Sequence, residues 1–122
     1  MNALVAAVVI ALAQVETPNG VPAHPGPAGE TGPWQLTPSV RIDRGREIRG
    51  RGERVTDEAI ATEQVLWLMR QHRANAGEPN MFMVAVAWNC GLTTVLESRV
   101  PVSSYQFAGR VMNLVEKQKE TQ

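Results

Sequence analysis

The chain has 122 residues, which suits one domain and leaves too little sequence for a second hydrophobic core. Apolar residues make up 43% and charged residues 20%, a mixture typical of folded globular proteins rather than of disordered chains. Twelve basic residues balance 12 acidic ones, which argues against a dedicated nucleic-acid-binding protein. The single cysteine, Cys90, excludes an intrachain disulfide, and the distant His24 and His72 lack zinc-site spacing. We therefore expect one domain, residues 1–122, with no metal ion or other cofactor.

The N-terminal segment MNALVAAVVIALAQ is strongly apolar and has two interpretations. Residues 4–13 are too few to span a bilayer, and they resemble the apolar part of a signal peptide that is cleaved after Ala13. However, no Lys or Arg precedes the run, and the segment continues without a break to Glu16. Alanine and leucine favour helix, and apolar residues on every side indicate burial. We favour a buried helix over residues 2–17 that Pro18 terminates, so that the chain shows no clear export signal.

Proline and capping residues define the next two elements. Residues 18–33 contain five of the eight prolines and four glycines, which predicts a long irregular loop after the first helix. Thr37 followed by Pro38 has the pattern of an N-cap with proline at the first helical position. We expect the second helix to extend from there to Ile48.

The third and fourth helices also have recognisable ends. Thr56 precedes two acidic residues, which favour the positive end of a helix dipole, and Gly77 provides the stop. Asn80 caps a short and very apolar helix over residues 81–89, which Gly91 ends.

The last helix is predicted from a capping-box pattern, with Ser103 followed three residues later by Gln106. Its polar tail, residues 115–122, is expected to fray. No pair of segments shows the alternation of paired strands. The sequence therefore predicts an all-α domain of about five helices, with a long Pro/Gly-rich loop after the first helix.

Glu16 is the carboxylate with the most unusual surroundings, because it ends an apolar helix and precedes a proline-rich loop. Burial raises the pKa of a carboxyl group, and the negative end of a helix dipole acts in the same direction. A carboxylic acid that stays protonated near neutral pH can act as the general acid in glycosidic cleavage. The plainer interpretation is a solvent-exposed glutamate at a helix end.

Two further segments carry side chains suited to sugars. Trp34 and Gln35 end a glycine-punctuated loop, and they offer an apolar ring face and an amide that can bond hydroxyl groups. Asn89 places a second amide at the end of the apolar helix. The plainer interpretations are a loop anchored by one buried tryptophan and an ordinary helix C-cap.

Half of the basic residues lie between positions 41 and 54. They are Arg41, Arg44, Arg46, Arg49, Arg51 and Arg54. Asp43, Glu47 and Glu53 partly neutralise them. This run is either an anion-binding edge or a solvated face with local ion pairs, and we favour the second interpretation.

Four segments, in this order, resemble the lysozyme-like lytic transglycosylase family, including its short phage-type muramidases. They are Ala13-Gln14-Val15-Glu16, Gly32-Pro33-Trp34-Gln35-Leu36-Thr37-Pro38, Ala87-Trp88-Asn89-Cys90-Gly91, and Tyr105 with Arg110-Val111. In the family, a Glu ends an apolar helix, a Gly-x-x-Gln-Leu/Ile-x-Pro motif follows a loop, and Ala-Tyr-Asn-Ala-Gly or Trp-Asn-Gly-Gly precedes a tyrosine. The resemblance extends over roughly residues 4–115. Thr17 and Pro18 stand where the family usually has Ser and Gly, and Cys90 replaces a small Ala or Gly.

The resemblance implies a lysozyme-like fold and cleavage of the β-1,4 bond between N-acetylmuramic acid (MurNAc) and N-acetylglucosamine (GlcNAc) in peptidoglycan. Glu16 would be the general acid, and then the base that closes a 1,6-anhydro ring in a lytic transglycosylase or activates water in a muramidase. The substrate-binding residues would be Gln35, Trp34, Asn89, Tyr105 and Thr17. A second carboxylate for hydrolysis would come from Glu30 or Asp43.

The expected partner is the glycan strand of peptidoglycan, bound by a monomer with no membrane span and no specific nucleic acid. The expected location is periplasmic, associated with the cell wall, or delivered by a phage. Two other functions remain open. One is a catalytically weak or inactive glycan-binding module, which the pair Thr17-Pro18 would mark. The other is a binder of anionic polymers through the arginine run, which the zero net charge disfavours.

Overall fold

The computed structural model describes residues 2–20 and 25–120, so His24 and part of the proline-rich loop lie outside it. In this part of the chain there are six helices. They are α1 (Ala3–Glu16), α2 (Pro38–Gly50), α3 (Asp57–Ala76), α4 (Met81–Cys90), α5 (Leu92–Leu96) and α6 (Val102–Glu120). The only strand-like feature in the described ranges is a bridge between Thr31 and Leu36. The all-α prediction is confirmed, with the short helix α5 as an addition that the sequence did not predict.

Side-chain caps begin four of these helices, at the predicted Thr37, Thr56 and Asn80 and also at Asn2, which was not predicted as a cap. The side-chain oxygens of Asn2, Thr37, Thr56 and Asn80 each accept a hydrogen bond from the backbone N–H three residues later, at 2.8 to 3.3 Å. Such bonds satisfy amide groups that have no partner within the helix. The predicted stops at Gly77 and Gly91 are also confirmed, because both glycines follow their helices at positive φ.

The last helix differs from its prediction at both ends. It begins at Val102, directly after Pro101, so Ser103 lies inside the helix instead of capping it. It then continues to Glu120, whereas fraying was expected from residue 115. The extension is held against α1: the side-chain amide of Gln118 donates a hydrogen bond of 2.9 Å to the carbonyl oxygen of Ala7. The charged tail is therefore helical through Glu120 and is attached to α1 at Gln118.

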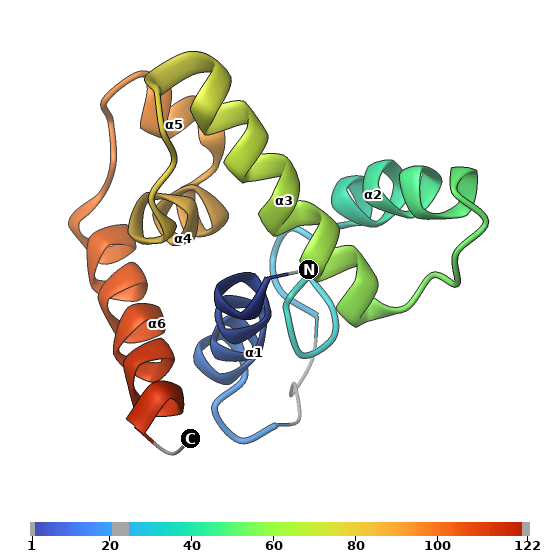
Figure 1. Ribbon diagram of the computed structural model, residues 1–122, viewed down its shortest axis with the longest axis horizontal. Coiled ribbons are helices and arrows are strands. Elements are labelled where there is room, and N and C mark those ends of the chain that lie inside the picture. The colour runs from blue at the N-terminus through green and yellow to red at the C-terminus, as the bar shows by residue number, and fades with distance from the viewer. Residues whose placement is uncertain (1, 21–24, 121–122) are drawn as a thin grey trace.

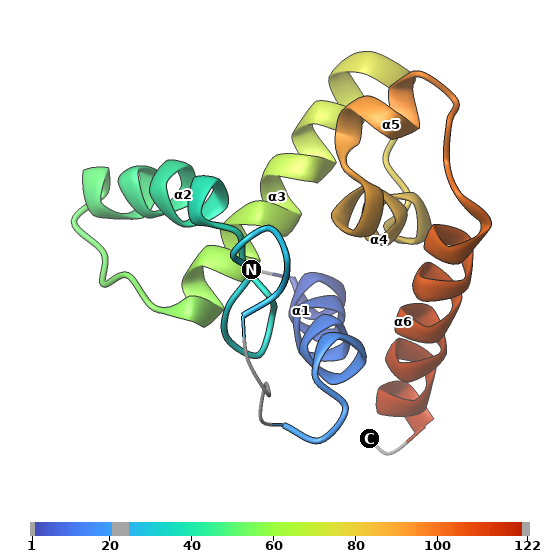
Figure 2. The same cartoon turned by 180° about the vertical axis from the view of Figure 1, so that it is seen from behind.

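The helices surround α3, which runs diagonally through the molecule (Figure 1). On one side of it, α1 packs against α6 and α3, α4 packs across α6, and α5 contacts α4 and α3. On the other side lies α2, which packs against α3, and the view from behind shows the same separation (Figure 2). We call α1, α4, α5, α6 and the side of α3 that faces them the apolar bundle. We call α2 and residues 51–56 the charged arm.

The apolar bundle contains most of the buried core. Its side chains with at most 4% exposure include Val5, Val8, Val9, Leu12, Val65, Leu68, Val84, Val86, Phe107, Val111 and Val115. The expectation that α1 is buried on every side is wrong, because Leu4 and Ile10 are 39% and 48% exposed. Their face of α1 borders a groove that the end of α6 also lines. None of the helices in the described ranges is both long and apolar enough to cross a membrane.

Candidate active site

Glu16 is the last residue of α1 and lies half-buried at the end of the apolar bundle. The pKa of its carboxyl group is raised above the ordinary value, chiefly because burial disfavours the charged form. The position follows from the sequence, since the apolar residues before Glu16 draw α1 into the core while Pro18 prevents the helix from continuing. The sequence predicts a raised pKa for Glu16, and the structure agrees in direction.

Two side chains from distant segments act on the Glu16 carboxyl group. A hydrogen bond from Trp88, in the last turn of α4, lowers its pKa, and the nearby charge of Glu30 raises it further. The tryptophan therefore favours the carboxylate form, whereas burial and Glu30 favour the acid form. Glu16 thus sits between opposing influences, an arrangement suited to a group that both gives and takes a proton.

A narrow hairpin carries the predicted Gln35. The N–H groups of Thr31 and Leu36 each donate to the other's carbonyl oxygen, at 3.1 and 2.9 Å, and enclose a four-residue turn. Gln35 occupies the left-handed region at φ 50°, where side chains other than glycine are strained by about 1–2 kcal/mol. A strained residue in a loop is a marker of a constrained, often functional, position.

The side chain of Gln35 shares a small pocket with Trp88. Its Nε2 donates to the carbonyl oxygen of Gly32 at 2.9 Å, which fixes the amide in the turn. The pocket, of about 70 Å³, is also lined by Val40 and by Gln64 of α3. Because Trp88 also bonds to Glu16, it links the acid to the pocket. The structure therefore brings Gln35 to Trp88, while its approach to Glu16 itself stays a prediction.

Trp34 and Thr17 anchor the hairpin to α1. The indole N–H of Trp34 donates to the carbonyl oxygen of Val9 at 2.7 Å, and its ring is partly buried against the core. The buried hydroxyl group of Thr17 lies 3.0 Å from the carbonyl oxygen of Ala13 and 3.1 Å from that of Pro33. Both side chains therefore have structural partners, and their substrate-binding role stays a prediction.

Asn89 of α4 and Tyr105 of α6 lie where these two helices meet. The Oδ1 atom of Asn89 accepts a hydrogen bond of 2.7 Å from the hydroxyl group of the buried Ser104. Tyr105 stacks on Phe82 with ring centroids 6.4 Å apart, and both rings are exposed. Each of the two side chains therefore has a partner on the other helix, and the substrate-binding role of both stays a prediction.

Glu30 is the candidate second carboxylate that acts on Glu16. Its Oε1 accepts a hydrogen bond of 2.7 Å from the amide of Ala28, and its carboxylate folds over Gly26, where a Cβ atom would collide with it. Asp43, the other candidate, is exposed on α2. Of the two, Glu30 has the better position for a role beside Glu16.

The arginine run is only partly a solvated face. Local ion pairs occur as predicted between Arg44 and Glu47 and between Arg51 and Glu53. The expectation of solvation is wrong for Arg44, which is 8% exposed and lies 4.8 Å over the ring of Trp67. Arg41 and Arg51 also reach α3, where they pair with Asp57 and Glu63. These arginines attach the charged arm to α3, because α2 has few apolar residues with which to do so.

Sequence reasoning missed three side chains of this region: Trp88, Gln64 and Phe82. Trp88 could have been noticed as the residue before Asn89 in the family-like segment, at the end of an apolar helix. Gln64 and Phe82 carry no comparable signal. Within the described ranges, no three His, Cys, Asp or Glu side chains gather as metal ligands would. Comparisons with protein-family models, curated proteins and solved structures found no match to the chain.

Proposed function

We propose that the protein is a lysozyme-like lytic transglycosylase that cleaves the β-1,4 bond between MurNAc and GlcNAc in peptidoglycan. The observation that carries this proposal is the state of Glu16, a half-buried carboxyl group with a raised pKa at the end of an apolar helix. A raised pKa increases the pH at which the carboxyl group still carries the proton that a general acid donates. The four family-like segments in the sequence support the choice of substrate.

In the proposed reaction Glu16 gives its proton to the glycosidic oxygen, and the bond between that oxygen and C1 of the muramyl residue breaks. The leaving GlcNAc carries the proton away as a hydroxyl group. The Glu16 carboxylate then takes the proton of the muramyl 6-hydroxyl group, whose oxygen bonds to C1 and closes the 1,6-anhydro ring. The hydrogen bond from Trp88 supports this step, because it stabilises the carboxylate that forms after the first proton transfer.

The pocket that Trp88 lines suits part of the substrate. It combines the amides of Gln35 and Gln64 with the ring of Trp88 and the aliphatic side chain of Val40. At about 70 Å³ it is too small for a sugar ring but suits a substituent such as the N-acetyl group. The amides would bond to the acetamido group, and the apolar surfaces would cover its methyl group.

Hydrolysis by a muramidase is a second candidate, and the position of Glu30 favours it. Its charge acts on Glu16, so two carboxylates lie in one electrostatic environment, as in many glycosidases. In that reaction a water molecule would attack C1 in place of the 6-hydroxyl group. The mass of the products distinguishes the two, because a 1,6-anhydro product is lighter by one water.

The test compares the wild type with Glu16→Gln on purified peptidoglycan. We expect the digestion rate to fall by about 10²–10⁴-fold, because the amide keeps the shape but supplies no proton. Binding to peptidoglycan should persist, since Gln35 and the pocket are unchanged. Glu78→Gln is the matched control, because that side chain is 87% exposed, and its rate should equal that of the wild type.

The other outcomes are equally informative. Equal rates for the wild type and Glu16→Gln would mean that Glu16 is not the acid, and Glu30→Gln would then be the next variant. Binding without digestion by the wild type would identify an inactive glycan-binding module. The absence of both would contradict the proposal.

A further inference from the structure

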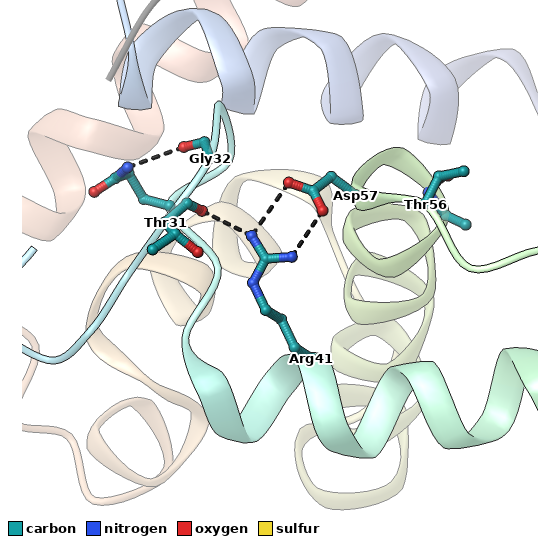
Figure 3. A network of polar contacts seen from close by, with 7 residues as sticks. Thr31, Gly32, Arg41, Thr56 and Asp57 are labelled. Atoms are coloured by element: carbon teal, nitrogen blue, oxygen red, sulfur yellow. Dashed lines mark hydrogen bonds and ion pairs between the residues drawn. The ribbon is translucent and has the colours of Figure 1, made fainter. Parts of the chain in front are cut away.

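An ion pair connects the charged arm to the first turn of α3. The Nη1 and Nη2 atoms of Arg41 lie 2.7 and 3.1 Å from the two carboxylate oxygens of Asp57, a bidentate geometry. Figure 3 shows the guanidinium group between α2, α3 and the hairpin. Both side chains are partly exposed, at 29% and 37%, and a pair of this exposure contributes little to the stability of a fold.

The same guanidinium group also holds the base of the hairpin. Its Nη2 donates a hydrogen bond of 3.0 Å to the carbonyl oxygen of Thr31, the residue that pairs with Leu36 (Figure 3). Arginine can serve the carboxylate and this carbonyl together because its donors are fixed in one plane. Lysine, a point charge without that planar fork, cannot reproduce the arrangement.

Gly32 brings the hairpin backbone against the ion pair. A Cβ atom at this position would lie 2.5 Å from Oδ2 of Asp57 and 3.2 Å from Nη2 of Arg41, and its φ of +79° also favours glycine. The carbonyl oxygen of Gly32 then accepts hydrogen bonds from the backbone N–H and the Nε2 of Gln35, at 3.0 and 2.9 Å. The ion pair and the amide of Gln35 are therefore separated by one short stretch of backbone.

We propose that Arg41 and Asp57 are positioning residues of the candidate active site, and that their ion pair holds the hairpin so that Gln35 keeps its place beside Trp88 and Glu30 its place near Glu16. This inference rests on the proposed function for its catalytic consequence. Trp34 and Thr17 already fix the hairpin to α1, so the ion pair supplies the attachment on the opposite side, to α2 and α3. Loss of that attachment lets the hairpin shift while α1 and its acid stay in place.

The test uses Arg41→Lys and Asp57→Asn with two matched controls. Glu58→Gln changes the other acidic residue in the first turn of α3. Unlike Asp57, Glu58 forms no ion pair with Arg41. Arg99→Lys alters an exposed pair, 2.6 Å from Glu97, that is far along the chain from the hairpin. Thermal melts should show similar small shifts for all four variants, because all four side chains are exposed or partly exposed.

The two Arg41–Asp57 variants should lose kcat by about 10- to 100-fold on peptidoglycan, while KM changes little and both controls keep the wild-type rate. Two readouts do not depend on activity. Hydrogen exchange at the amide of Leu36 should become faster, since its partner Thr31 loses the bond to Arg41. NMR titration should show the pKa of Glu16 moving down, because Glu30, which adjoins Thr31, no longer keeps its place.

These readouts separate the two proposals. An inactive wild type would contradict the proposed function, while faster exchange at Leu36 and an altered Glu16 titration would still support the positioning role. Unchanged exchange and an unchanged Glu16 titration in both variants would overturn the positioning role, whatever the activity. A loss of kcat that merely follows the fraction of folded protein would also overturn it.

Discussion

The apolar bundle and the charged arm are built by different means, although both are helical. In the bundle, α1 carries one charged residue among 14 and α4 carries none among ten. In the arm, α2 carries four arginines and two acidic residues among 13. Burial of apolar surface is non-directional, whereas hydrogen bonds and ion pairs constrain the geometry of the groups that they join. The bundle therefore supplies most of the stability, and the arm supplies directed attachments to α3.

The candidate active site lies where these two regions meet. Glu16 belongs to the bundle, and the hairpin of Gln35 is attached to the bundle through Trp34 and to the arm through Arg41. The acid is thus held by packing, while the hairpin beside it depends on both kinds of interaction. The comparison predicts that stability and catalytic geometry can be altered separately.

The largest expected effect on stability is a truncation in the bundle. Leu12→Ala should lower the free energy of unfolding by about 2–5 kcal/mol, because Leu12 is fully buried and the change leaves a cavity. Ile10→Ala on the same helix is the control, and its half-exposed side chain should cost less than about 1 kcal/mol. Urea denaturation measures both. Equal losses would show that the open face of α1 is also packed.

A smaller effect is expected at the buried arginine of the arm. The Nε and Nη1 atoms of Arg44 are buried without a hydrogen-bond partner in the described part of the chain. Arg44→Met keeps an unbranched apolar side chain over Trp67 and removes the buried charge, so stability should stay equal or rise by about 1–4 kcal/mol. Arg44→Ala should lower it by about 0.5–3 kcal/mol, because the ring loses its cover.

Arg46→Met, at an exposed position of the same helix, is the control for this pair and should change little. The measurement is again urea denaturation. A loss in Arg44→Met as large as that in Arg44→Ala would show that the cation itself holds the arm on Trp67.

The smallest expected effect is on the pH dependence of stability. The pKa of a carboxyl group is raised in the bundle, at Glu16, and lowered in the arm, at Glu53. The pKa of Glu16 is higher in the folded protein than in the unfolded chain. Its contribution to stability is therefore complete at pH values below the pKa of the unfolded chain, and it is lost as pH rises through the pKa of the folded protein. Arg51 lowers the pKa of Glu53 in the folded protein. The contribution of Glu53 to stability is therefore present at pH values above its pKa in the unfolded chain, and it is lost as pH falls through its pKa in the folded protein.

Denaturation of Glu16→Gln and Glu53→Gln over a range of pH tests this contrast. Relative to the wild type, Glu16→Gln should gain stability as pH rises above the ordinary carboxyl value of 4.5. The wild type should lose its advantage over Glu53→Gln as pH falls below that value. Parallel pH profiles of the two variants would contradict the difference between the regions.

Local signals account for what could be predicted from the sequence. Thr37, Thr56 and Asn80 cap helices through backbone groups three residues away, so their pattern is visible in a short window. Helix α5 has no side-chain cap bond and spans only five residues, which explains why it was missed. The direction of the pKa shift at Glu16 could be predicted because it follows from the burial of the apolar helix that Glu16 ends.

The remaining part of the candidate site depends on contacts between distant segments. Trp88 acts on Glu16 across many intervening residues, and Arg41 binds Asp57, which lies 16 positions further along the chain. No spacing rule specifies such pairs, because the packing of α3 against its neighbours determines them. The arginine run looked like a solvated face for the same reason, since Trp67 and Asp57 lie beyond its local window.

The hydrogen bond between Gln118 and Ala7 has a consequence for synthesis of the chain. It joins residues 111 positions apart, and at about 5–20 residues per second the ribosome needs about 5–20 s to make the intervening chain. During this time α1 has emerged without the α6 surface that covers it. The helix that carries Glu16 is thus translated before α6, which covers it, and we expect its packing to be a late event in folding.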